Sequence, residues 1–284
     1  MDFWIVQGLN GISFGMLLFL LAAGLSLVFG LMRIVNLTHG SFYLLGAYIG
    51  FAVIERTGSF LVALIVAPVC VTVLALLMHR FLLRRFQHVE LAQVLLTFGL
   101  LFIFADLTLW KWGGYSYVLP KPAFLATSLT IGHIVFPTYR LFVIATGVVI
   151  ALLLWFVLEC TALGSMVRAG VDDEEMVRGL GINTPRLFTA VFALGAFLAA
   201  LSGVIGGPFV GAYPGADFEV LLLALVVVII GGLGSIRGAF VGSLVVGLID
   251  TFGRALVPEL AMFTIFAPMV LILALRPRGL FGRA

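Results

Sequence analysis

Long apolar runs dominate the chain and predict helices that cross a membrane. A helix needs about 20 residues to cross roughly 30 Å of hydrocarbon. Runs of that length lie at 11–31, 60–79, 91–110, 141–160, 187–207 and 258–275. The segments 34–54 and 220–256 are also apolar, but they join their neighbours without a polar loop. The pattern predicts an all-α, polytopic membrane helix bundle with about 8–10 transmembrane helices, roughly nine of them by our count, in a single transmembrane domain over 1–284.

Two glycine-containing breaks interrupt the less regular segments, one at 33–40 and one at 231–238. Non-helical backbone at membrane depth is tolerated only where protein or a water-filled cavity supplies hydrogen-bond partners. We therefore expect the breaks to lie on a translocation pathway, in which His39 either meets the solute or braces the break. Both breaks lead into glycine-spaced helices, which indicate either a diverged internal repeat or close helix packing. The candidate pathway residues are Asn36, His39, Gly40, Ser41, Gly232, Gly234 and Ser235.

Composition and charge support a membrane protein. The chain is 63% hydrophobic and 10% charged, with a mean hydropathy of +1.25, which is more apolar surface than a soluble core of this size can bury. Its net charge is +3, but single basic residues at the ends of apolar runs do not form a nucleic-acid surface. The positive-inside rule places most of them in the cytoplasm and the N-terminus outside. The expected cytoplasmic set is Arg33, Arg80, Arg84, Arg85, Arg168, Arg178, Arg186, Arg237, Arg276, Arg278 and Arg283, and the expected outer set is Arg56, Lys111, Lys121, Arg140 and Arg254.

The remaining polar and aromatic residues suggest local roles. The aromatic-rich loop 111–140 is expected to form an interfacial belt. Asp217 and Glu219 are expected to form an exposed acidic rim that receives a partner protein, and Asp250 is expected to pair with Arg254 one turn away.

Histidines and cysteines give no sign of a metal site or a cofactor. His79 and His88 are expected at the surface, and Cys70 and Cys160 are expected to be small hydrophobic packing residues. No set of His, Cys and carboxylates has the spacing of metal ligands.

The only dense charged run lies at 168–186. Asp172 is suited to be an N-cap with Glu175 as its capping-box partner, and Gly179 or Gly181 is suited to end the helix. Thr184 and Pro185 then begin the next span. This capping predicts a short, rigid, charged helix held between two membrane helices on the cytoplasmic side.

Three motifs resemble permeases of the branched-chain amino acid ABC importer family, and they follow one another along the chain in the family's order. They are the run from Arg168-Ala169 through Leu180-Gly181-Ile182-Asn183, the stretch Ile34-Val35-Asn36-Leu37-Thr38-His39-Gly40, and Gly231-Gly232-Leu233-Gly234-Ser235. The chain looks like the shorter of the two permeases that such importers carry, although Leu37 and Thr38 replace the family's commoner Phe-Ala. The resemblance implies a cytoplasmic coupling segment at about 161–186, whose short helix docks on an ATP-binding subunit. The implied coupling residues are Arg168, Asp172, Asp173, Glu174, Glu175, Arg178, Gly181 and Asn183.

The resemblance also implies the partners and the function. The chain would be the permease subunit of an importer in the cell inner membrane, working with a related longer permease, two cytoplasmic ATP-binding subunits, a periplasmic solute-binding protein and membrane lipid. Since the sequence holds no phosphate loop of the Gly-x-x-x-x-Gly-Lys-Ser/Thr type, we expect it not to be an enzyme and ATP to be hydrolysed by the partner. Branched-chain amino acids are the implied cargo, with urea, short amides and aromatic or organic acids as alternatives. The alternative function is a secondary transporter or channel, which also uses broken helices and repeats.

Overall fold

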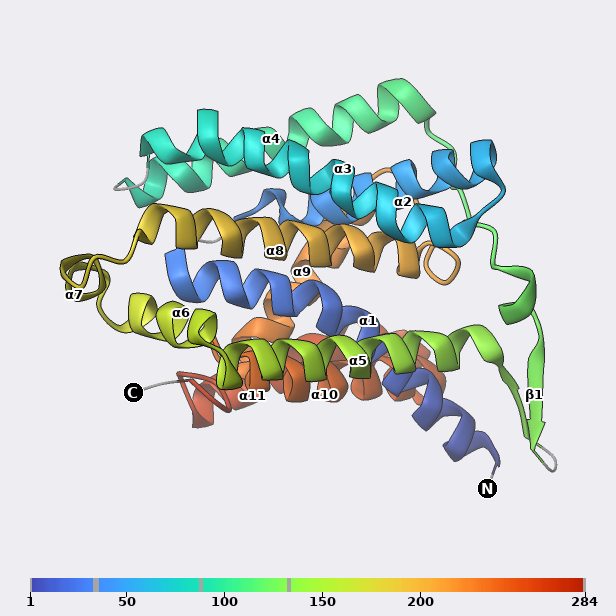
Figure 1. Cartoon of the computed structure of the whole chain (residues 1–284). Coiled ribbons are helices and arrows are strands. Elements are labelled where there is room, and N and C mark those ends of the chain that lie inside the picture. The colour runs from blue at the N-terminus through green and yellow to red at the C-terminus, as the bar shows by residue number, and fades with distance from the viewer. Residues whose placement is uncertain (1, 33–35, 87–88, 132–133, 283–284) are drawn as a thin grey trace.

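The computed structural model describes residues 2–32, 36–86, 89–131 and 134–282 as a helical bundle with one small hairpin (Figure 1). The predicted Arg33, His88 and Arg283 lie outside the described residues. The helices are α1 (Asp2–Met32), α2 (Thr38–Thr57), α3 (Phe60–Phe81), α4 (Glu90–Trp112), α5 (Thr138–Cys160), α6 (Ala162–Asp172), α7 (Glu174–Gly179), α8 (Thr184–Gly206), α9 (Ala216–Gly231), α10 (Ile236–Leu256) and α11 (Ala261–Leu275). Short 3-10 turns lie at Leu83–Phe86, Ala123–Leu125 and Pro258–Leu260, and strands β1 (Ser128–Ile131) and β2 (Ile134–Pro137) pair antiparallel.

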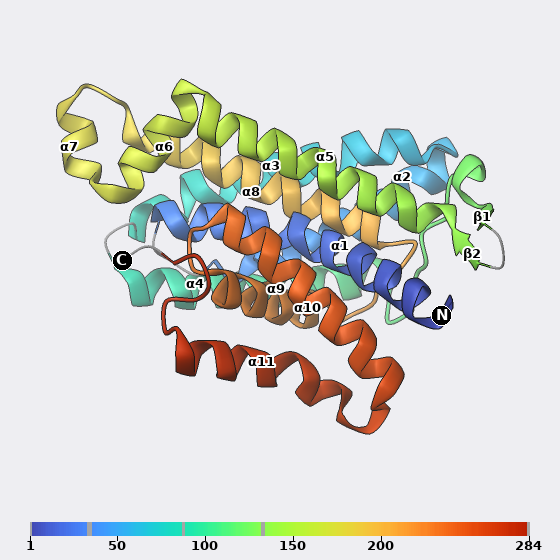
Figure 2. The ribbon, with the colours of Figure 1, turned by 90° about the horizontal axis from the view of Figure 1, so that it is seen from below.

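Six of the described helices are long and apolar enough to cross a membrane: α1, α3, α4, α5, α8 and α10. The shorter helices α2, α9 and α11 run along the same bundle (Figures 1 and 2). Together they confirm the predicted all-α polytopic membrane fold. The predicted number of crossings, about 8–10, stays a prediction. The last span begins at Ala261 rather than at the predicted residue 258, because Pro258–Leu260 form a 3-10 turn.

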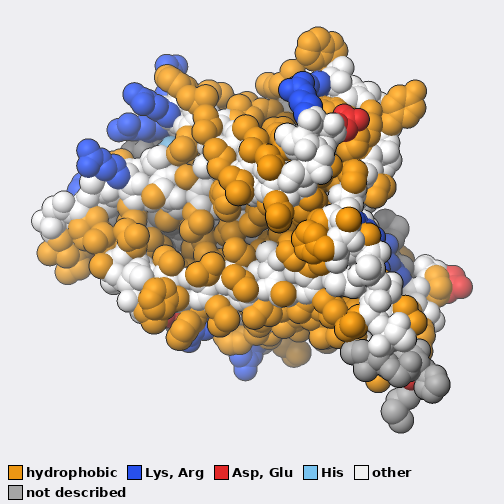
Figure 3. Space-filling view, turned by 45° about the vertical axis from the view of Figure 1, so that its right-hand side comes forward, with side chains coloured by type: hydrophobic (Ala, Val, Ile, Leu, Met, Phe, Trp, Pro, Cys, Tyr) orange, Lys and Arg blue, Asp and Glu red, His pale blue; other side chains and the backbone are white. Residues whose placement is uncertain are grey.

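Helices α1 and α8 form the centre of the bundle. In the most apolar window of each, 83% of α1 and 72% of α8 is buried, compared with 17% of α5. Helices α5, α8, α9 and α10 pack around α1, and α2 and α3 pack on α8. The peripheral helices therefore present apolar side chains outward, and Figure 3 shows hydrophobic side chains covering the broad middle of one such face. This is the surface of a protein whose solvent is lipid.

Glycines bring the central helices into backbone contact. A Cβ atom at Gly46 of α2 would overlap the carbonyl oxygen of Ala200 in α8, and one at Gly15 of α1 would lie 2.7 Å from the carbonyl oxygen of Ser243 in α10. Gly247 packs in the same way against α1. The predicted glycine spacing therefore serves close helix packing. An internal repeat stays a prediction.

The charged residues divide between the two ends of the bundle as the sequence predicts. Consecutive membrane helices alternate in direction, so that α7 and the C-terminal tail lie at one end, and the N-terminus and the hairpin lie at the other (Figures 1 and 2). The end with α7 carries Arg80, Arg84, Arg85, Arg168, Arg178, Arg186, Arg237, Arg276 and Arg278. The opposite end carries Arg56, Lys111, Lys121, Arg140 and Arg254. That the α7 end faces the cytoplasm stays a prediction.

Part of the predicted aromatic-rich loop 111–140 is buried and hydrogen-bonded, rather than exposed at the membrane interface. Trp110 and Tyr115 are exposed as predicted, but Tyr139 is buried and its hydroxyl donates to the Ile205 carbonyl at 2.7 Å. Tyr117 pairs its backbone with Ala212, which joins the two loops at this end of the bundle. The belt interpretation is therefore wrong for the buried part of this loop.

Two further predictions of surface position are wrong. Asp217 is only 2% exposed, so the predicted acidic rim consists of Glu219 without it, and His79 is 3% exposed. Both residues lie where another helix covers the side of the helix that carries them, which a single sequence does not reveal. Conversely, Cys70 and Cys160 are exposed on the described surface rather than packed inside it.

Candidate functional site

The charged run predicted to be a rigid coupling helix forms a small, capped unit at one end of the bundle. This unit consists of α6 and α7, and it is called the coupling unit below after its predicted role. Asp173 caps α7, because its Oδ1 accepts a hydrogen bond from the Met176 amide at 2.9 Å. The predicted cap, Asp172, instead ends α6. Two helices thus meet at one residue, and the capping side chain is one position later than the pattern suggested. The side chains of Asp172 and Glu174 lie outside the described residues.

The end of α7 and the start of α8 are fixed as tightly. Gly181 has a φ of +82°, a left-handed conformation that suits glycine after a helix. The Ile182 amide then donates to the Val177 carbonyl at 3.3 Å. Asn183 caps α8 by accepting from the Arg186 amide at 3.1 Å, and Pro185 stands in the first turn. The predicted glycine stop is confirmed.

Helix α7 and its C-cap residue carry apolar side chains that the described residues leave largely exposed. Met176 is 68% exposed and Leu180 is 75% exposed, whereas Val177 is buried. Asp173, Glu175 and Arg178 are exposed beside them. Because α7 projects from the end of the bundle (Figure 2), this surface combines apolar side chains with charges, as protein docking surfaces do.

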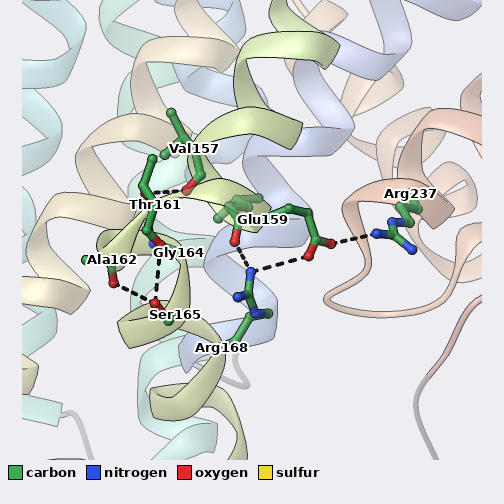
Figure 4. A network of polar contacts seen from close by, with 9 residues as sticks. Val157, Glu159, Thr161, Ala162, Gly164, Ser165, Arg168 and Arg237 are labelled. Carbon is green, nitrogen blue, oxygen red and sulfur yellow. Dashed lines mark hydrogen bonds and ion pairs between the residues drawn. The ribbon is translucent and has the colours of Figure 1, made fainter.

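A network of polar contacts joins the coupling unit to two membrane helices (Figure 4). Arg168 of α6 donates to the Leu158 carbonyl and lies 3.5 Å from the Glu159 carboxylate at the end of α5. Arg237 in the first turn of α10 lies 2.9 Å from the other oxygen of Glu159. Sequence reasoning selected Arg168 but missed Glu159, whose partner Arg237 is far away along the chain.

The turn between α5 and α6 leaves little freedom of movement. Thr161 caps α6 by accepting from the Gly164 amide at 3.3 Å, and it also donates to the Val157 carbonyl at 2.5 Å. A Cβ atom at Gly164 would overlap the Leu158 carbonyl. Helix α6 is therefore held against the end of α5.

The first predicted break lies inside the bundle. His39 Nε2 is 3.0 Å from the Leu21 carbonyl, which lies about three helical turns before the end of α1. Asn36 Oδ1 accepts from the Thr38 amide at 3.1 Å and so begins α2. His39 is completely buried, and this contact supports its interpretation as a brace. Its Nδ1 atom, Asn36 Nδ2 and Ser41 Oγ have no hydrogen-bond partner among the described residues.

Gly40 explains why this break is close-packed. A Cβ atom there would overlap the carbonyl oxygen of Asp217, so any other residue would push α9 away from α2.

The second predicted break lies at the end of the bundle, where the C-terminal tail covers it. The amides of Leu280 and Phe281 each donate at 2.9 Å to the last carbonyls of α9. Gly234 packs against Gly30 of α1, and Ser235 caps α10 by accepting from the Gly238 amide at 3.0 Å. Gly232, Gly234 and Ser235 therefore have structural roles in this arrangement. Their place on a pathway stays a prediction, as it does for Asn36, His39, Gly40 and Ser41.

A cavity of about 530 Å³ lies at the opposite end of the bundle from α7. Its walls come from α1, α2, α5, α8, α9, α10 and the loop after α8. None of the predicted pathway residues lines it, but Tyr43 does, one helical turn after His39. Sequence reasoning missed this cavity because its polar residues lie far apart along the chain.

Comparisons with known proteins agree with each other over almost the whole chain. A family model described as the permease component of the branched-chain amino acid transport system matches residues 8–275. The high-affinity branched-chain amino acid transport system permease protein LivH of Escherichia coli K12 is 27% identical over 298 residues, which covers 99% of this chain and 96% of LivH. The corresponding protein BraD of Pseudomonas aeruginosa is 25% identical over 295 residues, with the same shares covered. The fructose import permease protein FrcC of Rhizobium meliloti is 33% identical over 132 residues, 44% of this chain and 36% of FrcC. No solved structure matches the chain significantly.

Proposed function

Since the chain belongs to the family of permease components of branched-chain amino acid transport systems, we propose that it is the membrane-spanning subunit of an ATP-driven importer. The multi-pass bundle supplies the membrane path, and α7 transmits the work of a separate ATP-binding subunit. Two such subunits, a related longer permease and an extracytoplasmic solute-binding protein complete the assembly. Its place is the inner membrane, and its cargo is branched-chain amino acids.

The exposed surface of α7 is the single observation that carries this proposal. A loop that only connects two membrane helices needs no apolar side chains in water, because exposing them is unfavourable. Met176 and Leu180 are nonetheless exposed, on a helix that is capped at both ends. A groove on a cytoplasmic subunit would bury them and would receive the adjacent charges. A secondary transporter has no use for such a surface.

The Glu159 network gives this docking a mechanical consequence. Because Glu159 touches both Arg168 and Arg237, a displacement of α6 and α7 acts on α5 and on the beginning of α10. Helix α10 packs on the central α1. The coupling residues Arg168, Asp173, Glu175, Arg178, Gly181 and Asn183 thus have separable tasks. Asp173, Gly181 and Asn183 shape the helix, Glu175 and Arg178 present charge, and Arg168 connects the helix to the membrane domain.

Co-purification tests the proposal. The tagged full chain is purified in mild detergent, the proteins that accompany it are identified, and their ATPase activity is measured. We expect P-loop ATPase subunits to accompany the wild type and to be lost from Leu180→Asp. The matched control is Tyr115→Asp, because Tyr115 is 76% exposed but lies in a loop at the opposite end. Recovery of the ATPase subunits with Leu180→Asp would contradict docking on α7, and their absence from the wild type would contradict the importer.

A further inference from the structure

We propose that the cavity opposite α7 is a binding site for a zwitterionic α-amino acid with an aliphatic side chain, in which Arg140 binds the carboxylate and Glu219 binds the ammonium group. This inference rests on the proposed function and adds to it the place of a binding site and a role for each of these two residues. The cavity volume of about 530 Å³ is in the usual range for small-molecule sites, roughly 300–1,000 Å³.

The charged side chains that line the cavity are two arginines and two acids, so their net charge is zero. Two of them satisfy each other, because Arg254 Nε lies 2.8 Å from Asp250 Oδ1, as the sequence predicted. Arg140 and Glu219 then remain, and among the described residues neither has an oppositely charged partner within 4.0 Å. One cation and one anion without ionic partners complement a zwitterion. An organic acid would leave Glu219 unmatched, and an uncharged amide would leave both groups unmatched.

Neutral partners hold the two remaining charges in place. Arg140 donates through Nη1 to the Asn10 side chain, and its guanidinium lies 4.7 Å from the centre of the Phe209 ring. A guanidinium has five N–H donors, so most remain free for a carboxylate.

Glu219 accepts from the Tyr213 hydroxyl at 2.6 Å. Burial, together with this hydrogen bond and the Glu219 charge, raises the pKa of Tyr213 to about 12. Tyr213 therefore remains a donor at neutral pH and orients the Glu219 side chain.

The deeper wall of the cavity fits an aliphatic side chain. Leu17 and Leu18 of α1 and Val220 and Leu223 of α9 line it. Burial of such a side chain against them is favourable by about 25 cal/mol per Å² of apolar surface.

Tyr43 provides an independent sign that the site is built for a ligand. It lines the cavity and is only 1% exposed. Its hydroxyl has no hydrogen-bond partner among the described residues. A buried polar group without a partner costs free energy, which a ligand that reaches this wall of the cavity would lower by hydrogen bonding to the hydroxyl. Because Tyr43 follows His39 by one turn, an occupied cavity also contacts the helix that starts at the buried break.

Binding of three related compounds tests the assignment. They are leucine, isocaproate, which lacks the amino group, and isoamylamine, which lacks the carboxylate. Their affinities are measured on the full chain in nanodiscs, with the subunits that co-purify and without the solute-binding protein. For Arg140→Gln we expect leucine to bind at least about tenfold more weakly, and isoamylamine to bind as to the wild type. For Glu219→Gln we expect weaker leucine binding and unchanged isocaproate binding.

Matched controls are Arg56→Gln and Glu55→Gln, exposed residues at the same end of the bundle that do not line the cavity. We expect them to leave all three affinities unchanged. Size-exclusion profiles check that each variant is folded, and Glu219→Gln keeps the test decisive if Arg140→Gln is not, because glutamine can still accept from Tyr213.

Three results would overturn the inference: equal losses for all three compounds, no loss in either cavity variant, or no wild-type binding of leucine. Failure of the proposed function gives a different result, in which leucine binds with this pattern but no ATPase subunit co-purifies.

Discussion

Arg237, in the first turn of α10, lies 2.9 Å from the carboxylate of Glu159, the penultimate residue of α5. Arg168 of α6 reaches the other oxygen of the same carboxylate at 3.5 Å. One acid therefore joins the coupling unit, a peripheral helix and a helix that packs on the centre. The side chains are 34–67% exposed, and exposed ion pairs contribute only about 0–1 kcal/mol to stability. We therefore propose that this network transmits the position of α6 to α5 and α10 rather than stabilising the fold.

Glu159→Gln separates transmission from stability. We expect the melting temperature to change little, because the ion pairs are exposed, and the amount of solute transported per ATP hydrolysed to fall. The measurement is uptake and ATP hydrolysis in the same proteoliposomes, with Glu55→Gln as the control. The double variant Glu159→Gln with Arg237→Gln should add little to either single change. An unchanged transport-to-hydrolysis ratio would refute the role of Glu159.

Substitutions of Asp173 separate helix capping from charge. Asp173→Ala removes the acceptor for the Met176 amide, which costs about 1 kcal/mol of helix stability. We expect it to weaken retention of the ATPase subunit and to uncouple hydrolysis from transport, with overall folding intact. Asp173→Asn keeps a good capping side chain and should restore most of the coupling. If both variants uncouple hydrolysis from transport to the same extent, the charge of Asp173 matters rather than its cap.

Glycine contacts predict where the bundle tolerates no methyl group. Gly46→Ala would force α2 and α8 apart, because the added Cβ meets the backbone of Ala200. We expect a loss of about 1–3 kcal/mol and a clearly lower melting temperature in detergent. Gly99→Ala is the control, since no atom lies within 4 Å of its added Cβ. Equal melting temperatures for the two variants would show that α2 and α8 are not packed this way.

Labelling of single cysteines tests the orientation. In a variant without Cys70 and Cys160, Tyr115→Cys should react with a membrane-impermeant maleimide in intact spheroplasts. Leu180→Cys should react only after permeabilisation, because the positive-inside rule places α7 in the cytoplasm. Both positions are exposed, so access alone decides the result. The reverse labelling pattern would show that α7 faces the outside and would contradict the predicted orientation.

Local patterns predicted the helices and the capped coupling unit well. The apolar runs correspond to α1, α3, α4, α5, α8 and α11, and Gly181 ends the turn after α7 as its type suggested. These features depend on neighbouring residues, so that hydropathy and capping rules apply directly. The cap at Asp173 was missed by one position because α6 continues through Asp172.

Features that depend on distant segments were not predictable from one sequence. Glu159 meets Arg237 only after α6 to α9 have intervened. The burial of His79 and Asp217 depends on the helices that cover them. The cavity brings together Asn10, Arg140 and Glu219 from three helices, and nothing near any of them in the sequence marks it as polar lining. Polar residues on membrane helices signal function in general, but at helix ends they are also common at the membrane surface, so the sequence does not single these three out.

The most direct test of the account is leucine uptake into proteoliposomes that contain the complex purified with this chain, with the solute-binding protein outside and ATP at the opposite face. The account predicts uptake that requires ATP and that is lost with Leu180→Asp, while Tyr115→Asp keeps it. Uptake that proceeds without ATP, unaffected by Leu180→Asp, would contradict the account and identify a secondary transporter.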